Sequence, residues 1–442
     1  MSWDVVVRIG NSDSFAPISQ GGPVLGVSFD RPGDPFLARE SVLDKIADVL
    51  GSVPGNTACD LLRAAIVVYS ADLLISRRYA ADGWTRDINV YLPVTSLAVW
   101  QQAGPLLTKL LTFLSGDRWQ FYFRESSAEQ ECYKKLPENL PEVVSLFSGG
   151  LDSLIGAIDL LSEGKKVALV SHHGGGSTPK FQNDLFKCLK DEYGEQVVPL
   201  QFYVLPPQVP RLDSDPDNED TTRTRSFLFF VLGIAVADTL GTGIPLYVAE
   251  NGLISLNVPL TPARLGSCST RTTHPYYIAL FRELLQALNL AHPLNLDYRF
   301  KTKGEMLRES KNQDLLRRTL PLSMSCAHPD NRRLENLPPG GHCGYCFPCI
   351  IRQAAVFESG IPDAAYDNDI FHLPPLSRSD KGKDLRAMEI ALERFSQRGE
   401  EKAVFDVLSS GPISPDELSH YIGVYCRGMK EIAKFLRSNK DE

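Results

Sequence analysis

The first third of the chain alternates short apolar runs with longer segments whose apolar residues recur at helical spacing. The apolar runs predict strands at residues 3–9, 88–92 and 119–123. The helical spacing predicts helices at residues 60–78 and 96–114. A break is expected in the second helix at Gly104–Pro105, because proline lacks the N–H that an α-helix uses. These elements predict an α+β region.

From residue 143 onward, short apolar strands alternate with helices. Strands are expected at residues 143–147, 167–170, 197–204 and 246–249. Helices are expected at residues 154–161, 226–239, 385–398 and 415–437. Strands that alternate with helices are typical of a doubly wound parallel sheet, so the predicted fold class is α/β.

Two shifts in composition divide the chain. All four tryptophans precede residue 120, and four cysteines cluster after residue 325. We expect an N-terminal α+β accessory domain at residues 1–135, a central α/β domain at 136–325, a cysteine-rich segment at 326–355 and a helical C-terminal region at 356–442. Residues 129–141 are the expected linker, and the proline- and acid-rich residues 206–222 form an expected surface loop.

The composition excludes several classes of protein. In 442 residues, 43% are hydrophobic and 23% charged, which is ordinary for a globular chain and excludes a mainly disordered one. The net charge of −8 argues against a protein that coats nucleic acid or an anionic membrane. The apolar run at residues 227–237 is shorter than the roughly 20 residues of a membrane span. The first residues lack the features of a secretory signal, so we expect a cytoplasmic protein.

The run Ser148-Gly149-Gly150-Leu151-Asp152-Ser153 follows a predicted strand and opens a predicted helix. Its glycines allow close backbone approach, and its hydroxyls and the first N–H groups of the helix suit a phosphate. A carboxylate among phosphate donors needs a cation, so Asp152 is interpreted as a ligand of phosphate-bound Mg²⁺. The alternative is a Ser/Gly turn with Asp152 as the helix N-cap. The run is neither a Walker A loop nor a dinucleotide fingerprint.

Four of the nine cysteines form a second feature, Cys326 followed by Cys343, Cys346 and Cys349. Four thiolates close a tetrahedral zinc site with no open position, which indicates a structural role. An iron–sulfur cluster is the alternative, because short tandem spacers also suit clusters.

The two features together resemble one family. Residues 148–153 resemble the pyrophosphatase loop (PP-loop) of the N-type ATP pyrophosphatases, which cleave ATP between its α- and β-phosphates. The cysteines, followed by Arg352, resemble the zinc segment of the 7-cyano-7-deazaguanine synthases (QueC). Residues 302–306 (Thr-Lys-Gly-Glu-Met) resemble the family's Thr-Lys-Ala-Glu-Ile, and Arg225-Ser226 stands where the family has Arg-Asn. The likeness covers residues 143 to about 355 and implies the adenine nucleotide alpha hydrolase-like fold.

The sequence also departs from that family. Residues 172–176 (His-His-Gly-Gly-Gly) and 269–275 (Ser-Thr-Arg-Thr-Thr-His-Pro) replace the family's Tyr-Gly-Gln and Asp-Cys-Arg-Pro segments. The N-terminal third and the helical tail have no counterpart in the minimal enzyme. This arrangement resembles the QueC-like component of the Qat anti-phage defence systems.

The resemblance implies that 7-carboxy-7-deazaguanine is adenylated by ATP and that an amine then displaces AMP. It assigns ATP binding to Ser148, Gly149, Gly150, Leu151, Asp152 and Ser153. Asp152 would hold Mg²⁺, and Arg225 and Lys303 would neutralise charge during the reaction; the alternative for both cations is a solvated surface position.

Three residues are candidates for substrate binding. Glu250 follows a predicted strand and would accept hydrogen bonds from a guanine-like base. Arg271 and His274 lie in a polar loop that would close over the site. The alternative for Glu250 is an ordinary acidic residue of a loop. The alternative for Arg271 and His274 is a loop without a role in binding.

The amine is open. Ammonia is the family's amine, and the added N-terminal region leads to the hypothesis that an amine of a partner protein from the same defence operon replaces it. Two other functions remain: a PP-loop enzyme that modifies tRNA, and a non-catalytic ATP-binding scaffold. The net charge of −8 weighs against strong nucleic-acid binding, and no membrane partner is expected.

Overall fold

The computed structural model describes residues 2–17, 22–126, 139–208, 219, 223–261, 271–330, 340–374, 378–379 and 381–438. The chain forms two compact units, each assembled from segments distant in sequence. Unit 1 comprises Met1–Val144, Leu200–Leu246 and Tyr277–Leu294, and unit 2 comprises Ser145–Pro199, Tyr247–Tyr276 and Asn295–Glu442. The four-part division expected from the sequence stays a prediction.

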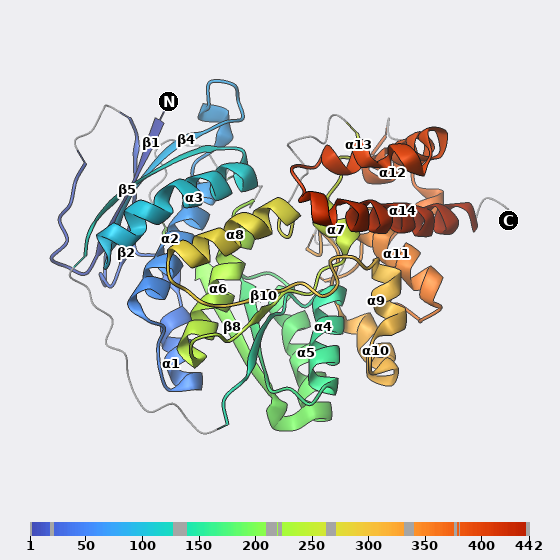
Figure 1. Ribbon diagram of the computed structural model, residues 1–442, viewed down its shortest axis with the longest axis horizontal. Coiled ribbons are helices and arrows are strands. Elements are labelled where there is room, and N and C mark those ends of the chain that lie inside the picture. The colour runs from blue at the N-terminus through green and yellow to red at the C-terminus, as the bar shows by residue number, and fades with distance from the viewer. Residues whose placement is uncertain are drawn as a thin grey trace. The chain divides into compact units, whose positions relative to one another are not determined.

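Unit 1 contains a four-stranded parallel sheet in the order β2-β1-β4-β5 (Figure 1). Its strands are β1 (Ser2–Ile9), β2 (Val24–Phe29), β4 (Asp87–Val94) and β5 (Arg118–Glu125). Its helices are α1 (Val42–Leu50), α2 (Asn56–Leu74), α3 (Leu97–Ser115) and α6 (Arg225–Leu240). Helix α2 is buried along nearly its whole length and packs against α6, which accounts for its apolar residues on all sides. The predicted strands and helices of this region are present.

The predicted break in α3 is wrong, because the helix runs through Pro105. Pro105 lies on the exposed side of the helix together with Gln101, the residue whose carbonyl loses its N–H partner. Gly104 faces inward, and a Cβ there would lie 2.8 Å from the Phe123 ring. Close packing of this glycine on β5 keeps the helix continuous.

The second sheet has six strands in the order β10-β9-β6-β7-β8-β3. They are β3 (Arg39–Glu40), β6 (Val143–Leu146), β7 (Val167–His173), β8 (Val197–Leu205), β9 (Leu246–Tyr247) and β10 (Leu294–Asn295). The chain proceeds from β6 through β7 to β8 in one direction and then continues with β9 on the other side of β6. In open α/β sheets, ligands bind beyond the strand ends at such a reversal. The α/β class is confirmed, and β6 lies at the reversal.

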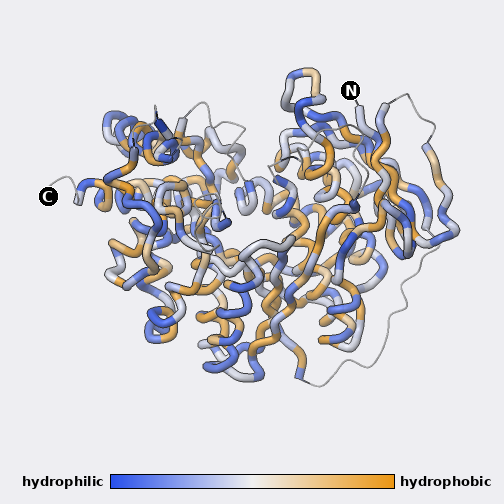
Figure 2. Tube along the Cα trace, turned by 180° about the vertical axis from the view of Figure 1, so that it is seen from behind, coloured by the Kyte–Doolittle hydropathy of each residue, from blue (hydrophilic) through white to orange (hydrophobic). Residues whose placement is uncertain are grey.

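The described helices of unit 2 all come after β6 in the chain (Figure 1). They are α4 (Leu151–Ser162), α5 (Thr178–Tyr193), α7 (Gly252–Leu256), α9 (Lys303–Glu309), α10 (Gln313–Thr319), α11 (Phe347–Ser359), α12 (Lys383–Arg398), α13 (Ala403–Leu408) and α14 (Pro415–Ser438). Helix α8 (Pro275–Ala287) follows the segment at residues 271–274 and belongs to unit 1 from Tyr277 onward. Apolar and polar residues alternate along the C-terminal helices (Figure 2), and α14 buries Tyr425, Met429 and Ile432 in their common core.

Two of the expected features fall partly or wholly outside the described residues. The expected linker at 129–141 is described only from residue 139, and most of the loop at 206–222 is not described. Among the described helices, none has the length and apolar character to cross a membrane.

Candidate functional site

The glycine-rich turn links β6 to α4. Gly149 has φ of +85°, a conformation that L side chains rarely adopt. The hydroxyl oxygens of Ser148 and Ser153 lie 3.2 Å apart, and the N–H of Gly150 donates to Ser148 Oγ at 3.2 Å. Ser153 Oγ donates to the Gly150 carbonyl at 2.9 Å. The turn therefore gathers two hydroxyls at the N-terminus of α4, where the helix dipole favours an anion.

Asp152 is buried in the first turn of α4. Its Oδ2 accepts from the backbone N–H of Asn251 at 3.2 Å and from Asn251 Nδ2 at 2.7 Å. Its Oδ1 accepts from the ammonium of Lys303. Gly150 is the N-cap, and no side chain caps the helix, so the alternative that Asp152 is the N-cap is wrong.

Lys303 is the first residue of α9 and is buried. A capping box holds this helix start: Thr302 Oγ accepts from the Glu305 N–H at 3.1 Å, and Glu305 accepts from the Thr302 N–H at 2.8 Å. A cation at a helix N-terminus opposes the helix dipole, so the ammonium needs a nearby anion. That anion is Asp152, and the two predicted catalytic residues are therefore paired.

Glu250 lies just after β9, next to Asn251, and accepts a hydrogen bond from Thr273 Oγ. The Thr273 and Ser255 hydroxyl oxygens are 3.0 Å apart. Burial and, to a smaller extent, the Asp152 charge raise the pKa of Glu250 to about 7, against the opposing effects of Thr273 and Lys303. The structure thus brings the segment at residues 271–274 against a carboxyl group that titrates near neutrality.

The predicted roles of Arg271 and His274 stay predictions. His274 is fully buried: its Nδ1 accepts from the Tyr276 N–H at 3.1 Å, and its Nε2 lies 3.0 Å from Ser410 Oγ. Burial, with the Arg271 charge, lowers the pKa of His274 to about 3, so the ring is neutral at physiological pH. Burial also lowers the pKa of Arg271.

Arg225 belongs to unit 1, where it is the exposed first residue of α6. Its predicted part in charge neutralisation stays a prediction.

The four predicted metal ligands come together in unit 2. Their sulfur atoms all lie within 4.8 Å of one another, and two pairs, Cys326–Cys346 and Cys343–Cys349, are 4.0 Å apart. Four thiolates around one zinc ion at 2.3 Å would lie about 3.8 Å apart. A multi-iron cluster needs more room between its thiolates. The residues present therefore fit a single tetrahedral ion, and the group could bind zinc.

Sequence reasoning missed the side chains that hold the site together. Asn251 orients Asp152, Thr273 contacts Glu250, and Ser325 accepts the Leu151 N–H at 3.3 Å. Only Asn251 carried a local signal, because it directly follows a predicted strand at the edge where ligands bind.

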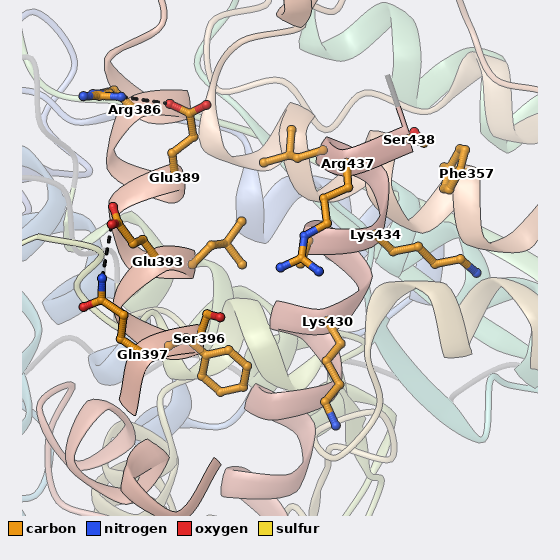
Figure 3. A pocket seen from close by; sticks show the side chains of 14 residues that line it. Phe357, Arg386, Glu389, Glu393, Ser396, Gln397, Lys430, Lys434, Arg437 and Ser438 are labelled. Carbon is orange, nitrogen blue, oxygen red and sulfur yellow. Dashed lines mark hydrogen bonds and ion pairs between the residues drawn. The ribbon is translucent and has the colours of Figure 1, made fainter. Parts of the chain in front are cut away.

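A separate cavity of about 1090 Å³ lies between α12 and α14 (Figure 3). Its polar side chains partly pair with one another, as in Arg386–Glu389 and Gln397–Glu393. No histidine, cysteine or aspartate is among its lining residues in the described chain.

The chain matches none of the known protein-family models. Over 145 residues it is 28% identical to a 7-cyano-7-deazaguanine synthase from Syntrophobacter fumaroxidans, a stretch that covers 31% of this chain and 53% of that protein. The chain thus spans about half the length of this curated relative. The likeness supports a QueC-like relationship for the matched stretch.

Proposed function

We propose that the protein adenylates a carboxylate, most closely 7-carboxy-7-deazaguanine, and passes the activated acyl group to an amine. The observation that carries this proposal is the buried group of Asp152, Lys303 and Asn251 at the start of α4. A buried carboxylate beside a phosphate-binding turn suits a phosphate-bound cation, and a buried lysine suits developing negative charge.

In the first step, a substrate carboxylate oxygen attacks the α-phosphorus of ATP, the bond to the bridging oxygen breaks and pyrophosphate leaves. The hydroxyls of Ser148 and Ser153 and the N-terminus of α4 would hold the departing phosphates. Asp152 would hold Mg²⁺, which supplies charge neutralisation. Lys303 would then exchange its contact with Asp152 for a phosphate oxygen.

In the second step, the amine forms a bond to the acyl carbon and releases a proton to solvent, and AMP leaves with the C–O bond electrons. Glu250 is suited to accept hydrogen bonds from the ring N–H and amino group of a guanine-like base when it is ionised. We propose an amine of a partner protein as the acceptor, in an anti-phage defence setting, with ammonia as the alternative. The N-terminal region and the departure at residues 269–275 motivate that choice.

The test is an ATP assay with 7-carboxy-7-deazaguanine, alone, with ammonia, and with co-expressed candidate partner proteins, read out as AMP, pyrophosphate and product mass. We expect equal amounts of AMP and pyrophosphate. Asp152→Asn should lower the rate by about 100-fold or more, because the isosteric amide loses the charge that a cation needs. Glu163→Gln is the matched control at the exposed end of α4 and should retain the wild-type rate.

Formation of ADP instead of AMP, or background pyrophosphate release with every carboxylate, would refute the proposal. The second result would favour the non-catalytic scaffold. A partner protein with no added deazaguanine mass would leave ammonia as the acceptor. Modification of tRNA, with a gel shift at physiological salt, would favour the tRNA-modifying alternative.

A further inference from the structure

The chain segment that leads into the four cysteines lies against the glycine-rich turn. The backbone N–H of Met324 donates to the Gly149 carbonyl at 2.8 Å. The hydroxyl oxygen of Ser325 accepts from the Leu151 N–H at 3.3 Å. A Cβ on Gly150 would lie 3.5 Å from the Met324 carbonyl oxygen, so the segment is in van der Waals contact with the turn. The residues before Cys326 therefore form one wall of the proposed phosphate site.

Arg352 holds this wall in place. The side chain is fully buried, and its guanidinium donates to the Ser323 carbonyl at 2.9 Å and to Ser325 Oγ at 3.4 Å. It also forms a two-pronged ion pair with Asp363, with distances of 2.8 and 2.6 Å. Such a fork fixes the guanidinium plane as well as its position. The position of Ser325 thus depends on where Arg352 lies.

Arg352 depends in turn on the four-cysteine group. Helix α11 begins after Cys346, its N-cap residue, and carries Cys349 in its first turn, one turn before Arg352. Cys326 directly follows Ser325. A metal ion bound by these thiolates would therefore fix two positions of the chain. One is the start of α11, which carries Arg352, and the other is Cys326, the residue next to Ser325. Because metal-binding free energy becomes folding free energy, metal binding would stabilise the wall.

Ser325 has the hydrogen-bonding capacity to contact a phosphate. Its oxygen accepts two N–H groups, from Leu151 and Arg352, so its own O–H remains to donate. Within the described part of the chain, this hydroxyl donates no hydrogen bond. A phosphate oxygen at the start of α4 would supply the acceptor.

We propose that the four-cysteine metal site and the phosphate-binding turn form one coupled unit, in which metal binding holds Ser325 in place as a further phosphate ligand. The phosphate contact rests on the proposed function; the coupling between metal and turn does not. The metal would therefore control nucleotide affinity without contacting the nucleotide.

The first experiment compares two serine variants by calorimetric titration of the metal-loaded protein with α,β-methylene-ATP and Mg²⁺. Ser325→Ala should weaken binding by about tenfold, because a hydrogen bond to a charged group is lost. Ser359→Ala is the matched control: its hydroxyl donates to the Val356 carbonyl at 3.1 Å, at the end of α11 opposite to the cysteines. Equal affinities for the two variants would overturn the role of Ser325.

The second experiment needs no nucleotide. Hydrogen exchange of the full-length protein is followed before and after a chelator removes the metal. We expect faster exchange at residues 145–153 together with residues 343–352, and unchanged exchange in α2 of unit 1. Protection of residues 145–153 that survives metal removal would overturn the coupling. If the wild type binds no nucleotide, the proposed function fails and Ser325 has no phosphate to bind, while this measurement still decides the coupling.

Discussion

At the residue scale, Asn251 determines the direction in which the Asp152 carboxylate faces. Its amide donates to Asp152 Oδ2, while its own Oδ1 accepts from the Ile254 N–H and caps α7. Asn251→Ser keeps a capping oxygen but removes the amide donor. We expect about a tenfold lower rate of pyrophosphate release, a higher Mg²⁺ concentration for half-maximal rate and little change in Tm. A wild-type Mg²⁺ dependence in this variant would contradict the assigned role.

In the proposed function, Glu250 would make substrate binding depend on pH. Burial and the Asp152 charge raise its pKa to about 7, and only the ionised carboxylate accepts two hydrogen bonds from a guanine-like base. Substrate affinity should therefore rise as the pH increases from 6 to 8. Glu250→Gln should weaken binding and remove this dependence. Because the folded protein binds this proton more tightly than the unfolded chain, Glu250 also lowers stability as the pH rises from about 4.5 to 7. Substrate titrations of the wild type and of Glu250→Gln between pH 6 and 8 provide the check.

Site residues that lie close together in the sequence could be predicted. Site residues that come together only through the fold could not. The turn at 148–153 and the cysteine cluster are contiguous patterns whose chemistry is readable from spacing. Asn251 meets Asp152 across 99 positions, and Ser325 meets Leu151 across 174. Such pairings depend on the order of strands in the sheet, which no local pattern specifies.

At the scale of elements, the start of α9 is fixed by its capping box and by α14. Thr302 Oγ also lies 2.5 Å from the Glu431 carboxylate of α14. Thr302→Ala should cost about 1 kcal/mol of stability through loss of the cap. It should also lower pyrophosphate release by more than that loss explains, because Lys303 is the next residue. Thr302→Ser retains the hydroxyl and should behave as wild type in both the unfolding and the rate measurement.

The elements themselves were largely predictable, since apolar runs and helical spacing follow from burial on one or both faces. The strands around 143–147 and 197–204 and the helix around 226–239 are present within a few residues. The expected break at Pro105 failed because packing of Gly104 on Phe123 outweighs the loss of one hydrogen bond on the exposed side. Tertiary contact thus overrode local propensity.

At the scale of the whole molecule, unit 1 is stabilised by a buried charge network. Asp117 accepts from Arg86 at 2.6 Å and from Arg77 at 2.9 Å, and Arg86 also bonds Asp72 at 2.6 Å. Burial alone would raise the pKa of Asp117, but the two arginines lower it below its ordinary value. The network therefore stabilises unit 1 at neutral pH and loses this contribution only in acid, as the pH falls through that lowered pKa.

Asp117→Ala should destabilise unit 1 by about 3–5 kcal/mol, because two buried guanidinium groups lose an anion. All four tryptophans belong to unit 1, so denaturant unfolding followed by tryptophan fluorescence reports on this unit. Asp87→Ala breaks the exposed pair with Arg118 and should change stability by less than about 1 kcal/mol. Equal unfolding midpoints for the two variants would contradict the network's importance.

The composition of the two units could not be predicted from the sequence. Unit 1 recovers residues 200–246 and 277–294 from the middle of the chain, and unit 2 takes the intervening segments. A division drawn along the sequence assumes that neighbours stay together, whereas a sheet whose strand order reverses at β6 interleaves distant segments.

The contacts of α14 have a consequence for how the protein matures. Arg427 pairs with Glu305 at 2.6 Å, and Glu431 meets Thr302, so two residues from the last helix secure the start of α9. During translation, Lys303 is synthesised more than 100 residues before these partners. A nascent chain that ends before residue 415 would therefore carry every predicted nucleotide ligand but lack the two α14 side chains that secure the start of α9. The proposed chemistry would then become possible only after α14 has been synthesised.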